Sequence, residues 1–102
     1  MYPGEGYTVF VTRIIISGRA RKQLLKVPTH IALKLKVWVN AVKTEGMVEV
    51  RKLPGFHDEP LKGKRRGQRS VRLSRAYRAI YTQSADGEVE IVRVEEVSKH
   101  DY

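Results

Sequence analysis

One segment, residues 29–43, constrains the fold of this 102-residue chain more than any other. Its apolar residues recur at intervals of four, three and four positions, which is the repeat of one face of an α-helix. These residues are Ile31, Leu35, Trp38 and Val42. Pro28 before the segment and Gly46 after it predict where the helix begins and ends. Because a helix with one apolar stripe must bury that stripe, the chain must supply a second layer.

Segments rich in β-branched and aromatic residues predict that this second layer is a sheet. We expect strands at residues 7–16, 69–75, 76–83 and 88–97. Asp86-Gly87 predicts a tight hairpin turn before the last strand. A further short helix is expected at residues 19–27, with Ser17 as a candidate N-cap. The predicted fold class is α+β, a single domain over residues 1–102. Its N-terminal strand is followed by two helices on one face of an antiparallel sheet, which a three-stranded meander completes.

The basic residues are concentrated in one part of the chain. Lys and Arg total 20 against 11 Asp and Glu, which gives a formal net charge of +9. Eight of the basic residues and no acidic ones lie between Lys62 and Arg78. Val71 and Leu73 interrupt this run at strand spacing, whereas Ser70, Arg72 and Ser74 occupy the alternate positions. The pattern favours a basic sheet face over a disordered basic arm, and such a face suits phosphate binding.

Several classes of protein are excluded by what the sequence lacks. Without cysteine there is no disulfide scaffold, no Cys-based zinc finger and no cysteine nucleophile. The chain has no apolar run long enough for a membrane span and no secretory signal at its start, so we expect a cytoplasmic protein. Its motifs predict neither a metal nor a cofactor, since the three histidines are scattered. A basic domain of this kind predicts an acidic partner, with nucleic acid as the first candidate and an acidic protein as the second.

The residues that remain for chemistry are basic, or carry an imidazole or a phenol. They are Arg72, Arg78, Lys99, His100 and Tyr102. Such a set suits RNA cleavage, because the 2′-hydroxyl of the substrate is itself the nucleophile. The protein then needs to move protons and to stabilise charge on the phosphoryl oxygens, tasks that suit histidine and arginine respectively. Trp38, Tyr77 and Tyr81 are predicted to be packing residues.

Residues 53–81 and the C-terminal residues 97–102 resemble the RelE/HigB family of toxins from bacterial type II toxin–antitoxin modules. The resemblance is carried by five motifs, which are Leu61–Gly63, Lys64–Gln68, Ser70–Leu73, Tyr77–Tyr81 and the terminal Val97–Tyr102. It implies an mRNA interferase that cuts messenger RNA, in most members on the ribosome, without a metal. It also implies a cognate antitoxin, often of the helix-turn-helix type.

Site residues follow from the same resemblance. Arg72, Arg78, His100 and Tyr102 are implied as catalytic, and Lys62, Lys64, Arg65, Arg66, Arg69 and Lys99 are expected to bind RNA. The chain departs from the family at two positions. Ser70 stands where a lysine is usual, and Glu96 stands where an arginine precedes the final tyrosine, with Lys99 as the candidate substitute.

Two other functions stay open at this point. A ParE-like inhibitor of DNA gyrase would have the same fold without the nuclease residues, and a non-catalytic RNA-binding module would bind without cleaving. Arg72, Arg78 and the His–Tyr tail favour the nuclease.

Overall fold

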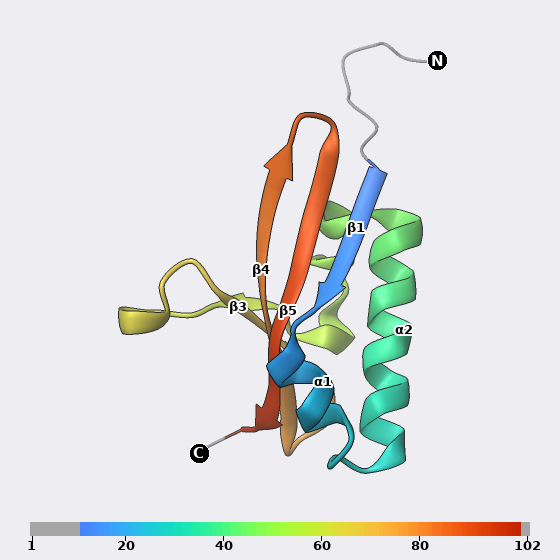
Figure 1. Cartoon of the computed structure of the whole chain (residues 1–102), viewed down its shortest axis with the longest axis vertical. Coiled ribbons are helices and arrows are strands. Elements are labelled where there is room, and N and C mark those ends of the chain that lie inside the picture. Colours follow the sequence, from blue (N-terminus) through green and yellow to red (C-terminus); the bar gives the residue numbers. More distant parts are fainter. Residues whose placement is uncertain (1–10, 101–102) are drawn as a thin grey trace.

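The computed structural model describes residues 11–100, which form a layer of helices against a sheet (Figure 1). The chain begins with β1 (Val11–Ile16), α1 (Gly18–Leu24), α2 (Thr29–Glu45) and α3 (Met47–Val50). Two short 3-10 turns, η1 (Pro54–Phe56) and η2 (Gly63–Arg65), flank the short strand β2 (Glu59–Pro60). The chain ends with β3 (Arg69–Arg72), β4 (Tyr77–Asp86) and β5 (Val89–Lys99). None of the helices in residues 11–100 is long and apolar enough to cross a membrane.

The sheet has five strands in the order β1-β5-β4-β3-β2. The α+β class is confirmed, and β3, β4 and β5 form the predicted antiparallel meander. The sheet as a whole is mixed, however, because β1 runs parallel to β5 from Val11↔Val89 to Ile16↔Val94. This corrects the expectation of a wholly antiparallel sheet. Parallel neighbours need a long crossover, and the helices and the meander supply it; the apolar pattern of a strand does not encode its direction.

The hairpin between β4 and β5 lies one residue further along than predicted. Asp86 and Val89 are register partners, so the two turn residues are Gly87 and Glu88. Gly87 has φ +62, a conformation that glycine adopts without steric cost. Glycine at the first central position is typical of the two-residue turns that join twisted strands.

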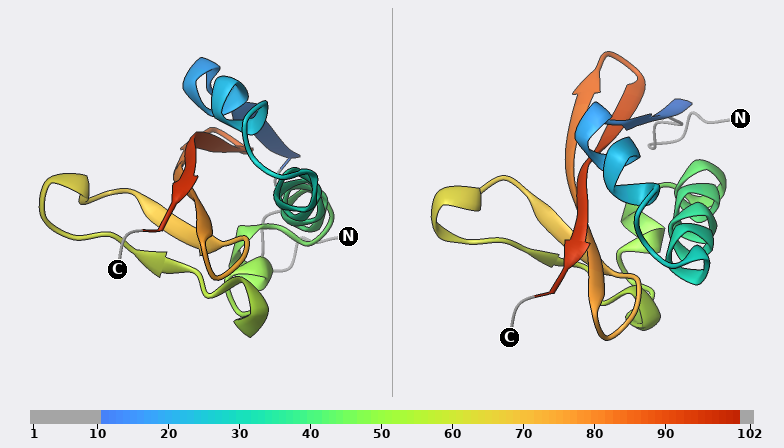
Figure 2. Two further views of the ribbon diagram at one scale, coloured as in Figure 1. Left: turned by 90° about the horizontal axis from the view of Figure 1, so that it is seen from below. Right: turned by 60° about the horizontal axis from the view of Figure 1, so that its bottom comes forward.

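The core lies between the helices and one face of the sheet. The predicted α2 stripe, Ile31, Leu35, Trp38 and Val42, is buried along its length. It packs with core-facing residues of the meander strands, and the Trp38 and Tyr81 rings lie 5.1 Å apart between centroids. Figure 2 shows α2 on one side of the sheet, while the η2 loop projects on the other. One face of the sheet is therefore covered by helices, and the opposite face is open.

The short helix α1 is tied to the end of β5 through its cap. The Ser17 hydroxyl accepts a hydrogen bond from the Ala20 N–H (3.0 Å), as predicted for an N-cap, and donates to the Glu95 carbonyl (2.8 Å). The helix ends at Leu24, three residues before the predicted end at residue 27. This arrangement fixes the first residues of α1 beside β5.

Candidate functional site

Strand alternation divides the meander residues between the two faces of the sheet. Val71, Ala79 and Val97 belong to the core and lie on the covered face. The next positions lie on the open face, in two rows of register partners. One row is Ser70, Ile80 and Glu96, and the other is Arg72, Arg78 and Ser98.

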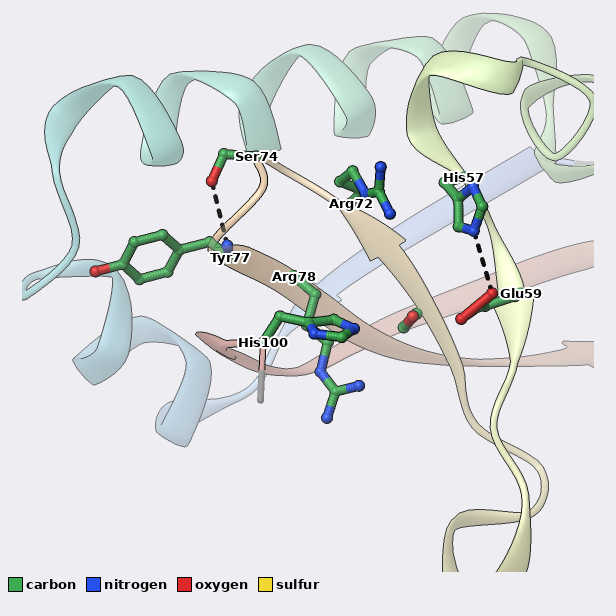
Figure 3. A pocket seen from close by; sticks show the side chains of 8 residues that line it. His57, Glu59, Arg72, Ser74, Tyr77, Arg78 and His100 are labelled. Atoms are coloured by element: carbon green, nitrogen blue, oxygen red, sulfur yellow. Dashed lines mark hydrogen bonds and ion pairs between the residues drawn. The ribbon is translucent and has the colours of Figure 1, made fainter. Parts of the chain in front are cut away.

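A pocket lies on the open face, where several segments meet (Figure 3). Arg72 enters from β3, Arg78 from β4 and His100 from the residue that follows β5. His57 and Glu59 contribute from the segment around β2. Ser70, Ser74 and Tyr77 also line the pocket, although the Tyr77 ring points away from Arg78 and His100 in Figure 3. Three of the predicted catalytic residues thus come together, and Tyr102 lies outside the described residues.

Arg72 and Arg78 form the most unusual feature of this pocket. They are direct register partners on adjacent antiparallel strands, an arrangement that places two positive charges opposite each other and is destabilising by itself. Neither arginine is in an ion pair with an acidic residue within residues 11–100. The buried Nε of Arg78 also has no hydrogen-bond partner in that range. Because buried donors are nearly always satisfied, this pair is suited to an anionic ligand.

His100 is held at the end of β5 by its own backbone. Its N–H donates to the Ala76 carbonyl at 2.7 Å, which ties the residue to the turn before β4. This bond holds the backbone of His100 beside the pocket, which its side chain lines together with Arg78.

His57 and Glu59 were not predicted as site residues, and the structure adds both. The Nε2 of His57 lies 3.3 Å from the Glu59 Oε2. His57 has φ +45, the only positive φ of a non-glycine residue among residues 11–100. Side chains in this region of φ carry a steric cost that is typically retained near functional sites. No sequence pattern reveals the pair, because β2 has only two residues and reaches the pocket through the Glu59↔Ser70 pairing.

Arg69, predicted to bind RNA, lies on the covered face. Its Nε donates to the Asp58 Oδ1 at 2.6 Å, and the Asp58 side chain is only 1% exposed. The Tyr81 hydroxyl donates to the other carboxylate oxygen. Burial and this hydrogen bond to Asp58 raise the pKa of Tyr81 to about 12. Arg69 therefore belongs to a buried hydrogen-bond network. Its position could have been predicted, because Arg69 and the core residue Val71 are two residues apart on a strand and must face the same side.

Arg65, also predicted to bind RNA, reaches the open face from the η2 loop. Its guanidinium donates to Glu96 at 2.9 Å and to Gln68 at 3.1 Å. Burial by itself would raise the pKa of Glu96, but hydrogen bonds from Arg65 and Ser98 and the charges of Arg65 and Arg19 lower it overall. Glu96 is thus an ionised anchor for nearby cations.

The other predicted RNA-binding residues differ in position. Lys62, Lys64 and Arg66 are exposed on the loop that projects from the sheet. Lys99 is exposed as well, but it pairs with Tyr77 and therefore faces away from the row of Arg78. The substitution of Lys99 for the family arginine remains a prediction that this geometry does not favour. No group of His, Cys, Asp and Glu side chains in residues 11–100 is arranged to hold a metal ion.

Comparison with known proteins identifies the fold. No protein-family model and no curated protein matches the sequence. Among solved structures, YafQ from E. coli strain BL21(DE3) aligns with a TM-score of 0.70 at 18% identity, over 87% of this chain and 93% of YafQ. A YoeB/ParE toxin from Agrobacterium tumefaciens gives a TM-score of 0.66 at 18% identity, over 87% and 99% of the two chains.

The chain has the RelE-like toxin fold. The RelBE2 toxin–antitoxin complex from Mycobacterium tuberculosis shares this fold with a TM-score of 0.51 at 18% identity, over 91% of this chain and 100% of that one. YafQ has also been solved in complex with DinJ, and YoeB of Staphylococcus aureus in complex with YefM. The predicted RelE-like architecture is therefore confirmed.

Proposed function

We propose that this chain is the toxin of a type II toxin–antitoxin module and that it cleaves messenger RNA on the ribosome without a metal. The observation that carries the proposal is the Arg72–Arg78 pair, whose opposed charges and unsatisfied Nε suit a phosphate. The RelE-like fold and the histidines on both sides of this pair add support.

The proposed reaction uses a nucleophile that belongs to the substrate. The 2′-oxygen attacks the adjacent phosphorus while the bond from phosphorus to the 5′-oxygen breaks. The products are a 2′,3′-cyclic phosphate and a free 5′-hydroxyl. One proton leaves the 2′-hydroxyl and another reaches the departing 5′-oxygen, and the phosphoryl oxygens gain charge in between. Arg72 and Arg78 would stabilise that charge through donors already in place before the reaction.

Two walls of the pocket offer groups for the proton transfers. Glu59, in contact with His57, is proposed as the base that accepts the proton of the 2′-hydroxyl. His100, at the other end of the pocket, is proposed as the acid that protonates the 5′-oxygen. Tyr102, two residues further along, is proposed to assist at the leaving group. This division of tasks places a carboxylate and an imidazole on opposite sides of the arginine pair.

A cognate antitoxin is the proposed protein partner. DinJ and YefM play that part for YafQ and YoeB, which have the same fold. We expect acidic residues of the antitoxin to neutralise the arginine pair on the open face, and we expect a helix-turn-helix domain in the antitoxin. The proposed site of action is the cytoplasm, where the ribosome is the target.

The test is brief expression of the wild type, Arg78→Ala and Tyr102→Phe, followed by primer extension on cellular mRNA. Arg78→Ala is expected to reduce cleavage by about 10²–10³-fold, since it removes a donor to the developing charge. Arg13→Ala is the matched control, because Arg13 is exposed on β1 at a distance from the pocket in the sheet order.

Two outcomes would contradict the proposal. If Arg78→Ala cleaves mRNA at the wild-type level, the arginine pair does not take part in the reaction. Inhibition of purified gyrase in a supercoiling assay, with no cleavage of mRNA, would instead assign the ParE-like function.

A further inference from the structure

A second hollow of the open face lies between the start of α1, the η2 loop and β5. Six charged side chains line it, namely Arg19, Lys64, Arg65, Arg93, Glu95 and Glu96. The rest of its lining is Ser17, Gly18 and Gln68, so within residues 11–100 no apolar side chain lines it. Basic residues outnumber acidic ones by four to two, and three separate segments of the chain contribute them.

Glu96 contacts two of the arginines that line this hollow. Its side chain is only 9% exposed, and a single carboxylate oxygen, Oε1, lies 2.9 Å from Arg65 Nη2 and 3.6 Å from Arg19 Nη1. Two guanidiniums are thus held together over one negative charge, which leaves an excess of one positive charge. Their side chains are 40% and 67% exposed, so N–H donors that Glu96 does not use remain accessible to a ligand.

The two acidic residues do not cancel the remaining charge. Glu95 accepts hydrogen bonds from Arg93 at 3.1 Å and from Thr82 at 3.0 Å, so Glu95 and Arg93 form a neutral pair. Glu96 is shared between Arg19 and Arg65, and Lys64 is exposed nearby on the same loop. The surface of the hollow is therefore cationic.

Glu96 in the hollow lies in the row of open-face side chains next to the row of the arginine pair. Ser98 is the register partner of Arg78, and Glu96 lies two residues before it on β5. Two residues of a strand span about 7 Å. This spacing of the two rows is comparable to the separation of neighbouring phosphates in an extended nucleic-acid strand.

The lining of the hollow favours a nucleic-acid backbone over a peptide. Peptides and proteins that dock stably bring apolar anchors into pockets, and the surface of this lining is mainly polar, with no apolar side chain among the described residues that form it. A single strand bound by its phosphates needs only a charged groove that follows the backbone.

We propose that Arg19 and Arg65, held together on Glu96, form a second phosphate subsite, which binds the RNA backbone next to the nucleotide in the arginine pocket. This inference rests on the proposed function. It adds Arg19, which the sequence did not indicate, to the residues that contact RNA. It also explains Glu96, which occupies a position where the family resemblance implies an arginine, since Glu96 holds two cations at that place.

The test measures binding of uncleavable RNA to the full-length protein. The probes are a 2′-O-methyl dinucleotide, which fits the arginine pocket alone, and a 2′-O-methyl 12-mer, which extends beyond it. Arg19→Ala is expected to weaken 12-mer binding about tenfold and to leave dinucleotide binding unchanged. The logarithmic slope of 12-mer binding against salt concentration is expected to decrease by about 0.7 for each phosphate that the variant no longer neutralises.

Two further variants make the result independent of folding defects. Arg65→Ala by itself leaves a buried carboxylate without its closest partner, so Arg65→Ala/Glu96→Gln is used to remove both charges together. Lys36→Ala/Lys43→Ala is the control, because it removes two exposed charges from α2, on the other side of the sheet. Arg65→Ala/Glu96→Gln is expected to weaken 12-mer binding as much as Arg19→Ala does, and Lys36→Ala/Lys43→Ala is expected to leave 12-mer binding unchanged.

The outcomes separate this inference from the proposed nuclease activity. Unchanged 12-mer binding by Arg19→Ala and by Arg65→Ala/Glu96→Gln would overturn the subsite, whether or not the wild type cleaves mRNA. Equal weakening by the α2 control would also overturn it. If Arg19→Ala and Arg65→Ala/Glu96→Gln lost binding to a polyglutamate peptide but kept binding to the 12-mer, the hollow would be a protein-docking surface and the subsite would likewise be overturned. Selective weakening of 12-mer binding would support the subsite even if the primer-extension test found no cleavage.

Discussion

Arg69 and Arg72 lie three residues apart on β3, and they face opposite sides of the sheet. Arg69 is on the covered face, where it donates to the buried Asp58 carboxylate, and Tyr81 donates to the same carboxylate. Arg72 is exposed on the open face, where its register partner is another arginine. The same residue type therefore meets a compensating charge on one face and a like charge on the other.

The difference shows how charge is used in this fold. On the covered face Arg69 is paired with the Asp58 carboxylate, so its charge is compensated and its guanidinium is not available to a ligand. On the open face the Arg72–Arg78 pair lacks a compensating partner, which costs stability and leaves donors for an anion. A count of basic residues along the chain does not distinguish these two situations, although they determine which arginines can bind RNA.

The largest expected effect comes from breaking the covered-face pair. Arg69→Ala leaves the Asp58 carboxylate, 1% exposed, without its cation, and the free energy of unfolding should fall by about 3–5 kcal/mol. Urea denaturation measures this loss. Arg69→Ala/Asp58→Asn should recover part of it, because the remaining buried group is then neutral. A loss below about 1 kcal/mol would show that the pair is not the structural element described above.

A second effect concerns Tyr81 at alkaline pH. Because folding raises the pKa of Tyr81 to about 12, the unfolded chain loses this proton first. The corresponding stability is complete below pH 10, and it should be lost as the pH rises from 10 through 12, to the extent of about 3 kcal/mol. Parallel unfolding curves of the wild type and Tyr81→Phe measure the difference, since Tyr81→Phe lacks this group and keeps the ring beside Trp38. Identical pH dependence of the two proteins would contradict the assignment.

The smallest expected effect comes from the open face. Arg72→Ala removes one of two opposed positive charges and should raise the free energy of unfolding by about 0.2–1 kcal/mol, whereas cleavage of mRNA should fall. Thermal unfolding of Arg72→Ala beside Arg13→Ala, another exposed arginine on a strand, provides the comparison. A marked loss of stability in Arg72→Ala would mean that this arginine has a structural role like that of Arg69.

Much of the fold could be predicted from the sequence because it depends on local patterns. The repeat of Ile31, Leu35, Trp38 and Val42 matches the buried stripe of α2, and Gly46 ends that helix. The meander was predicted from its β-branched segments and from a turn signal between the last two strands. The observed turn lies one residue further along than predicted. The parallel pairing of β1 with β5 was missed, because strand direction depends on the path of the whole chain.

The candidate site could be predicted only in part. Alternation along β3 was enough to place Arg72 on the open face, and the same alternation could have placed Arg69 with the core. His57 and Glu59 reach the pocket through a two-residue strand, which leaves no periodic pattern in the sequence.

The sequence by itself determined the helix stripe, the meander and the concentration of basic residues, since these follow from the order of side chains along the chain. The tertiary structure alone decided which basic residues meet a carboxylate and which do not. Asp58 reaches Arg69 across 11 positions, and Glu96 reaches Arg65 across 31. The strength of an ionic interaction depends on distance and burial in the folded state, and neither quantity is contained in residue order.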